Sequence, residues 1–103
     1  MDARVTDAPE RQRYEIRVDG EEVAGFVDYR TTTDGLLVLT HTEVDPSYKG
    51  RGVGGRLVQG VLEDVRARGG RVLAVCPFAR KWIERHPDYA DLVHRVEESR
   101  VTD

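Results

Sequence analysis

The sequence predicts one small α/β (α+β) domain, with an antiparallel meander of three strands, a crossover helix, a parallel fourth strand and a C-terminal helix. Apolar residues alternate with polar ones before residue 45 and recur at helical spacing after residue 52, with a glycine-rich turn between. The length of 103 residues supports a single domain. We place it at residues 10–95 and expect residues 1–9 and 96–103 to be flexible tails, since neither end carries a pattern that could pack.

Three strands are expected in the first half. Residues 14–18 alternate apolar and polar side chains, and Asp19-Gly20 follows as a hairpin turn. Residues 23–29 form the returning strand, and a turn at residues 31–35 leads into a long strand at 36–44 that is rich in β-branched and apolar residues. The short connections predict antiparallel neighbours.

The second half predicts a helix that covers the sheet. Its apolar side recurs at helical spacing, at Val53, Leu57, Val58, Val61, Leu62 and Val65. Gly69-Gly70 ends this helix, and residues 71–75 form a strand that a helical crossover brings parallel to the third strand. Pro77 suits the first turn of a last helix, on which Phe78 and Trp82 share one face.

Composition narrows the class of protein. The longest apolar run, at residues 36–39, is far shorter than the roughly 20 residues of a membrane-spanning helix, so no membrane partner is expected. No apolar signal core opens the chain and Cys76 is the single cysteine, which favours a cytoplasmic protein. A net charge of −3 argues against nucleic acid as the main partner. No metal is expected, because the histidines and the cysteine lack ligand spacing, and we expect a monomer or weak dimer.

The glycine turn between strand and helix predicts an anion site, because glycines let the backbone approach a ligand and a helix N-terminus attracts negative charge. Three phosphate motifs compete for it. Gly50 and Gly55 have Walker A spacing, but Arg56 follows where a lysine should stand. A dinucleotide GxGxxG also fits the glycines, but Cys76 follows the next strand in place of an acidic residue.

The third motif uses the whole neighbourhood of the turn. The run from Glu43 to Pro46, followed by Tyr48-Lys49-Gly50-Arg51-Gly52-Val53-Gly54, resembles the coenzyme A signature of the GNAT superfamily of N-acetyltransferases, with Lys49 in a slot usually held by Gln or Arg. His41-Thr42-Glu43-Val44 and Cys76-Pro77-Phe78 resemble motifs of a small single-domain subgroup of that superfamily.

The resemblance implies an enzyme that binds acetyl-CoA (coenzyme A) and transfers the acetyl group to a primary amine of a small molecule or protein, as yet unidentified. Backbone amides of the turn would meet the pyrophosphate, and backbone near Glu43 and Val44 would pair with the pantetheine arm between two splayed strands. Cys76 would lie near the thioester, and Lys81 on the last helix could reach a phosphate. The remaining implied cofactor residues are Lys49, Gly50, Arg51, Gly52, Val53, Gly54, Gly55 and Arg56.

Three residues are candidates for catalysis. Glu43 is the preferred base, because an unbulged strand would place it with His41 on one apolar face, where burial tunes both groups for proton transfer. Either residue could instead be structural, Glu43 as an exposed charge and His41 as a hydrogen-bonded core residue. Cys76 could accept the acetyl group covalently or could be a small buried apolar residue beside the thioester.

The last helix lacks the tyrosine that protonates the leaving thiolate in many superfamily members, although Tyr89 lies just beyond it. The absent acid favours an alternative, a non-catalytic module that binds or senses acyl-CoA. Glu43 favours the enzyme.

Overall fold

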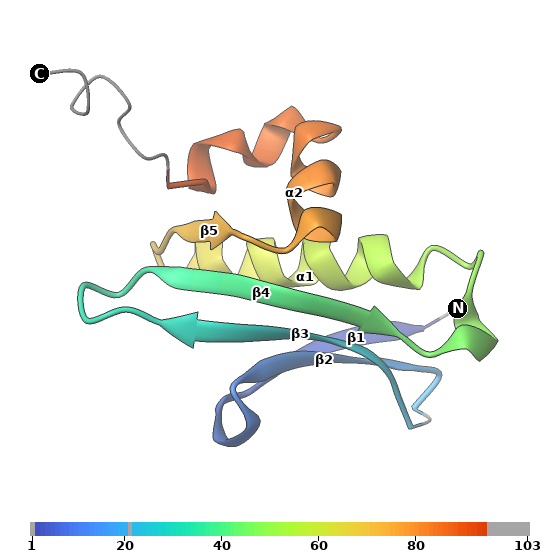
Figure 1. The fold of residues 1–103 in the computed structure, drawn as a ribbon. Coiled ribbons are helices and arrows are strands. Elements are labelled where there is room, and N and C mark those ends of the chain that lie inside the picture. Colours follow the sequence, from blue (N-terminus) through green and yellow to red (C-terminus); the bar gives the residue numbers. More distant parts are fainter. Residues whose placement is uncertain (1, 21, 95–103) are drawn as a thin grey trace, which may run out of the picture.

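The computed structural model describes residues 2–20 and 22–94, which form a five-stranded sheet with its helices on one face (Figure 1). The strands are β1 (Ala3–Ala8), β2 (Arg13–Val18), β3 (Val23–Thr31), β4 (Leu37–Val44) and β5 (Val72–Ala74). The helices are α1 (Val53–Ala67), α2 (Pro77–Glu84) and the short 3-10 segments Pro9–Arg11, Pro46–Tyr48 and Pro87–Leu92. The other face of the sheet has no helix over it in the described chain (Figure 1).

The strand order is β1-β2-β3-β4-β5, antiparallel as far as β4 and parallel between β4 and β5. The predicted meander, helical crossover, parallel strand and C-terminal helix are therefore confirmed. The meander has four strands, however, because β1 adds to its edge.

The prediction of a flexible tail at residues 1–9 was wrong for residues 3–8. Residues 3–8 pair antiparallel with β2, from Ala3 opposite Val18 to Ala8 opposite Arg13. Val5 packs so closely over α1 that a Cβ added at Gly60 would lie 2.5 Å from its Cγ2 atom. A glycine in the helix thus provides the space that lets β1 dock, a tertiary fit that local pattern does not reveal. The second predicted tail, residues 96–103, lies outside the described residues.

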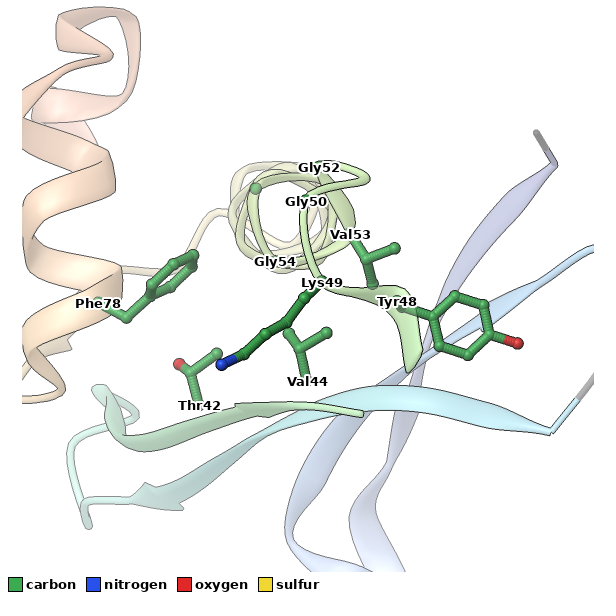
Figure 2. A pocket seen from close by; sticks show the side chains of 10 residues that line it. Thr42, Val44, Tyr48, Lys49, Gly50, Gly52, Val53, Gly54 and Phe78 are labelled. Atoms are coloured by element: carbon green, nitrogen blue, oxygen red, sulfur yellow. The ribbon is translucent and has the colours of Figure 1, made fainter. Parts of the chain in front are cut away.

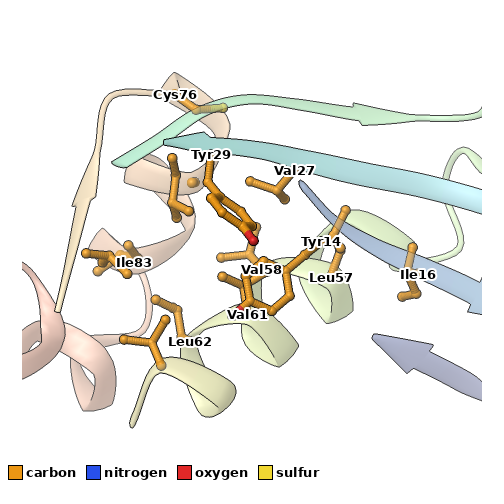
Figure 3. Close-up of a cluster of buried hydrophobic side chains, with 14 of the residues drawn as sticks. Tyr14, Ile16, Val27, Tyr29, Leu57, Val58, Val61, Leu62, Cys76 and Ile83 are labelled. Carbon is orange, nitrogen blue, oxygen red and sulfur yellow. The ribbon is translucent and has the colours of Figure 1, made fainter. Parts of the chain in front are cut away.

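The core lies between α1 and the sheet (Figure 3). All six predicted apolar positions of α1 are buried, and Ile16, Val27 and Leu39 meet them from three strands. Each such Val, Leu or Ile contributes about 1.5–3 kcal/mol when fully buried. This burial fixes α1 against the sheet and so fixes the turn that precedes it.

A β-bulge in β4 changes which side chains face the helices. Tyr29 of β3 lies opposite Leu39 and Asp28 opposite His41, so Thr40 is an extra residue. Because side chains alternate along a strand, one extra residue exchanges the faces that follow. Leu39 is buried in the core, while His41 beyond the bulge is exposed. The prediction of an unbulged strand was therefore wrong.

The strands β4 and β5 pair over three residues only, ending at Leu39 opposite Ala74. The amides of Val75 and Cys76 then both donate to the Leu39 carbonyl, each at 3.0 Å, and the chain turns into α2. In the described chain, β4 consequently has no strand beside residues 40–44 on this side. A gap opens between β4 and the start of α2.

Candidate functional site

A cavity of about 390 Å³ lies between the end of β4, the glycine turn, the first turn of α1 and the start of α2 (Figure 2). It is a single site assembled from both halves of the chain. Its lining residues are Thr42, Val44, Tyr48, Lys49, Gly50, Gly52, Val53, Gly54, Gly55 and Phe78.

The turn before α1 is held by local hydrogen bonds and glycine backbone geometry. Asp45 Oδ1 accepts hydrogen bonds from the Ser47 amide at 2.9 Å and the Ser47 hydroxyl at 2.7 Å, and these bonds lower the pKa of the Asp45 carboxyl. Gly50 and Gly52 have φ values of +78° and +76°, with no atom within 4 Å of an added Cβ. Backbone conformation, rather than space, therefore requires these two glycines.

The N-terminus of α1 borders the cavity and is suited to an anion. Gly52 is the N-cap and provides no side-chain cap, and no acidic residue lies in the first turn. A helix leaves its first amides without intrahelical acceptors, and the helix dipole makes this end positive. The Arg51 amide donates to the Tyr48 carbonyl at 3.3 Å, and the Arg56 amide to the Gly52 carbonyl at 3.1 Å. The donors left for a ligand are therefore those of residues 52–55.

Two of the predicted ligand-approach glycines also serve packing between the helices. A Cβ at Gly54 would lie 2.7 Å from Phe78 Cζ, and one at Gly55 would lie 3.0 Å from Trp82 Nε1. The aromatic face of α2 thus rests directly on the first turn of α1, and the cavity wall depends on both glycines.

Lys49 extends across the cavity, with its amine directed toward Thr42 (Figure 2). Among the described residues that line the cavity, it alone carries a charged side chain. The positive end of α1 and Lys49 together give this space a positive electrostatic character.

At the β4 side of the cavity, Thr42 Oγ1 lies 3.1 Å from Cys76 Sγ. Cys76 is the N-cap residue of α2 and is 4% exposed, so it lies behind Thr42 rather than in the lining. Thr42 is half-buried and lines the cavity, with its hydroxyl oxygen on the side toward Phe78 and its methyl group on the side toward the Lys49 amine (Figure 2).

Glu43 and His41 project on the other side of β4. Their Oε1 and Nε2 atoms lie 3.1 Å apart, and the side chains are 63% and 57% exposed, respectively. The predicted apolar setting for this pair was wrong, because the bulge at Thr40 turns Thr42 and Val44 toward the cavity instead. The pair lies on the open face of the sheet, beside the gap.

The basic residues predicted near the ligand are dispersed. Arg51 lies over the Tyr48 ring, with 5.5 Å between the guanidinium carbon and the ring centroid. Arg56 lines a separate hollow beside β1, and Lys81 is exposed on α2 outside the cavity lining. Lys49 is the basic side chain that reaches the cavity.

Three lining residues were absent from the predicted site: Thr42, Tyr48 and Phe78. Thr42 belongs to the His41-Thr42-Glu43-Val44 motif, Tyr48 to the glycine turn and Phe78 to the Cys76-Pro77-Phe78 motif. Their positions in these motifs could have suggested all three as lining residues. Thr42 was missed because the bulge that exposes it to the cavity has no local sequence signal.

The Tyr89 hydroxyl, which could have replaced the absent acid, is already bound elsewhere. It donates to Glu63 at 2.8 Å and accepts from Gln59 Nε2 at 3.3 Å, and the hydrogen bond to Glu63 raises the Tyr89 pKa. These partners lie on α1 and not at the cavity.

Over the described residues, no group of three or more His, Cys, Asp and Glu side chains could hold a metal ion. None of the helices in that part of the chain has the length and apolar character needed to cross a membrane.

Known proteins share this sequence pattern and architecture. Protein NATD1 of Mus musculus is 25% identical over 84 residues, covering 82% of this chain and 76% of the relative. The NMR structure of a GCN5-like protein from Staphylococcus aureus superimposes with a TM-score of 0.67 at 25% identity, covering 92% of this chain and 91% of that one. A ribosomal-protein-alanine N-acetyltransferase from Brucella melitensis biovar Abortus 2308 shares the fold, with a TM-score of 0.52 at 18% identity, over 82% of this chain and 62% of that one.

A family model described as GCN5-related N-acetyl-transferase matches residues 13–92, which include every strand from β2 onward, both helices and the whole cavity lining. The chain therefore belongs to the GCN5-related N-acetyltransferase family.

Proposed function

We propose that this chain binds acetyl-CoA and transfers its acetyl group to a primary amine of a small molecule or an exposed amine of a protein. One observation carries the proposal. The N-terminus of α1, which has no side-chain cap, and the edge of β4 beyond Leu39, which has no strand beside it in the described chain, border the same cavity. A site for an anion would therefore adjoin a site for an extended chain. Coenzyme A has these two parts, a pyrophosphate and an amide-containing pantetheine arm.

The pyrophosphate would lie against the amides of residues 52–55. Left-handed Gly50 and Gly52 let the backbone turn around a phosphate, and the absence of a first-turn carboxylate leaves the helix dipole uncompensated. The turn and the helix N-terminus thus favour a ligand with negative charge at this end. Lys49 would add a positive charge to the cavity, with its amine toward Thr42.

The pantetheine arm would follow β4 in the gap beyond Leu39 and Ala74. Backbone groups of an unpaired strand edge can bind an extended amide chain as they would bind another strand. Val44 lines the cavity along this edge and supplies an apolar contact. The thioester would then lie toward Thr42, with Cys76 behind it.

The acceptor amine would approach from the open face of the sheet, where Glu43 and His41 lie together. A carboxylate within hydrogen-bond distance of an imidazole can accept the proton that the amine loses. Exposure to solvent suits an acceptor site that must admit a lysine or a small amine. The acceptor would therefore reach the thioester in the gap beside β4, from the face of the sheet opposite to the helices.

A non-catalytic acyl-CoA-binding module is the second candidate function. It is favoured by the absence of a free phenol at the thioester end: the Tyr48 hydroxyl points away from Thr42 (Figure 2), and Tyr89 binds Glu63. The two functions differ in turnover and not in binding, so binding must be measured first.

Thermal unfolding with increasing CoA or acetyl-CoA tests the shared part of the proposal. A ligand at a hundredfold excess over its Kd stabilises the fold by about 2.7 kcal/mol. Gly52→Ala should lose this stabilisation, whereas the matched variant Gly69→Ala should keep it, since Gly69 also has a positive φ but lies at the far end of α1. Absence of any shift at millimolar ligand would contradict both functions.

Turnover separates the two candidates. Release of free thiol from acetyl-CoA should depend on an added amine, tested with polyamines, amino acids and lysine-containing peptides. Binding without amine-dependent thiol release across all three amine classes would favour the sensing module.

A further inference from the structure

Because of the bulge in β4, the side chain of Thr42 and not that of Glu43 lines the cavity. Without the extra residue Thr40, strand alternation would turn Glu43 toward the helices and Thr42 away from them. The observed register places the Thr42 side chain at the cavity, across from the glycine turn (Figure 2). A hydroxyl group thus lies where alternation along an unbulged strand led us to expect a carboxylate.

The direction of the hydrogen bond between Thr42 and Cys76 decides whether the Thr42 O–H is available to a ligand. Cys76 is buried, and its sulfur lies 3.1 Å from Thr42 Oγ1. Thr42 also faces the cavity, where water or ligand can accept its proton. Either atom can donate in this contact, and when the thiol donates to Oγ1 the Thr42 O–H is left to donate into the cavity.

The hydroxyl groups of Ser47 and Tyr48 near the cavity already have an acceptor or point away from Thr42. The Ser47 hydroxyl donates to Asp45, and the Tyr48 hydroxyl points away from Thr42. Lys49 is the one charged group of the described lining, and its amine is directed toward Thr42. Thr42 and Lys49 are therefore the two groups that could stabilise negative charge at this end.

We propose that Thr42 is a catalytic residue that donates a hydrogen bond to the sulfur of the acyl thioester, and that Cys76 is a positioning residue that orients the Thr42 hydroxyl. The inference rests on the proposed function. As the amine nitrogen bonds to the acyl carbon, the carbon–sulfur bond breaks and its electron pair passes to sulfur. The amine proton passes to the Glu43–His41 side, and CoA leaves as a thiolate that water protonates after release. Thr42 stabilises that thiolate and keeps its own proton.

The thiol pKa of bound CoA tests this role without turnover. It is followed by the ultraviolet absorbance of the thiolate during a pH titration, and the same titration with desulfo-CoA subtracts the contribution of Cys76. A hydrogen bond to a charged group should lower the bound thiol pKa by about one unit or more relative to a site without the donor. Thr42→Val should lose this lowering, and Thr42→Ser should retain it.

Two further variants separate the contributions of Cys76 and Lys49 to the thiol pKa of bound CoA. Cys76→Ala should give a thiol pKa between those of the wild type and Thr42→Val, because the hydroxyl remains but loses its orienting partner. Lys49→Met measures the charge effect, and in its background Thr42→Val should change the thiol pKa by as much as it does in the wild type. Equal thiol pKa values for wild type and Thr42→Val, or a Thr42→Ser variant that matches Thr42→Val, would overturn the inference.

The same experiment distinguishes failure of the inference from failure of the proposed function. If CoA causes no thermal shift in the wild type, the proposed function fails and this inference fails with it. If CoA binds but the thiol pKa does not respond to Thr42, the inference alone fails. If the pKa responds and no amine releases thiol, Thr42 binds the coenzyme thiolate in a non-catalytic module, which contradicts the catalytic role proposed here.

Discussion

The Tyr14 hydroxyl of β2 donates a hydrogen bond of 2.6 Å to the Asp64 carboxylate of α1. Asp64 also lies 3.0 Å from Arg68, which contacts Asp7 of β1 at 3.2 Å, and Asp7 accepts a 2.6 Å hydrogen bond from Tyr29 of β3. This network joins three strands to the C-terminal half of the helix whose other end borders the cavity. The stability of this network therefore bears on the position of the glycine turn that precedes α1.

Tyr14→Phe should lower the free energy of unfolding by about 1–3 kcal/mol, because Asp64 loses a partner in a partly buried setting. Tyr89→Phe is the matched control, since its hydrogen bond to Glu63 is exposed. It should cost less than Tyr14→Phe. Urea denaturation of both variants measures the difference, and equal costs would show that burial does not strengthen the network.

Alkaline pH should destabilise the fold through the same tyrosines. Burial and the hydrogen bond to Asp7 raise the pKa of Tyr29 to about 12, and burial with the Asp64 contact raises the Tyr14 pKa as well. An unfolded tyrosine ionises near its ordinary pKa of 10.0, while the folded one keeps its proton. Stability is thus fully present below pH 10 and falls between pH 10 and about 12. Urea titrations across that interval should show a shallower fall for Tyr29→Phe.

Gly54→Ala should destabilise the protein through Phe78. The added Cβ would lie 2.7 Å from Phe78 Cζ, so the Phe78 ring or α2 must shift, at a cost of about 1–3 kcal/mol. Combining Gly54→Ala with Phe78→Ala should recover part of this loss, because the clash is removed. A double variant whose cost is the sum of the single costs would show that the two residues are not coupled.

Lys49→Met should weaken CoA binding and reduce its dependence on salt. Lys49 is the charged side chain of the described lining, whereas Lys81 lies on α2 outside it. We expect a loss of about three- to tenfold for Lys49→Met, in keeping with a partly screened charge pair of about 1 kcal/mol. Lys81→Met is the control and should bind as the wild type does. Calorimetric titrations at low and high salt test both, and a larger loss at Lys81 would reverse the assignment.

Glu43→Gln should slow acetyl transfer by about a hundredfold while leaving CoA affinity unchanged, since a general base contributes about 10²–10⁴ in rate. The affinity for CoA should stay unchanged because the Glu43 side chain lies on the open face of the sheet, outside the cavity lining. Glu84→Gln, which alters an exposed carboxylate of α2, is the control for lost charge. Amine-dependent thiol release measures the rate. An unchanged rate for Glu43→Gln would remove this residue from the proton path.

Much of the fold could be predicted because it depends on the spacing and conformational preferences of residues that are close in sequence. The six apolar positions of α1 follow helical spacing, and all six are buried. The glycine turn was predictable for the same reason, since Gly50 and Gly52 adopt the left-handed conformations that few other residues tolerate. Docking of β1 was not predictable, because it depends on Val5 meeting Gly60, a residue distant in sequence.

The sequence by itself determined the order of α1, β5 and α2, the apolar stripe of α1 and the glycine turn before it, because spacing and backbone freedom are properties of neighbouring residues. Only the tertiary structure decided which side chains meet at the site. The extra residue Thr40 appears only when β4 is paired with β3, and it turns Thr42 to the cavity and Glu43 to the open face. Strand register is a relation between two segments, so a pattern read along one of them cannot contain it.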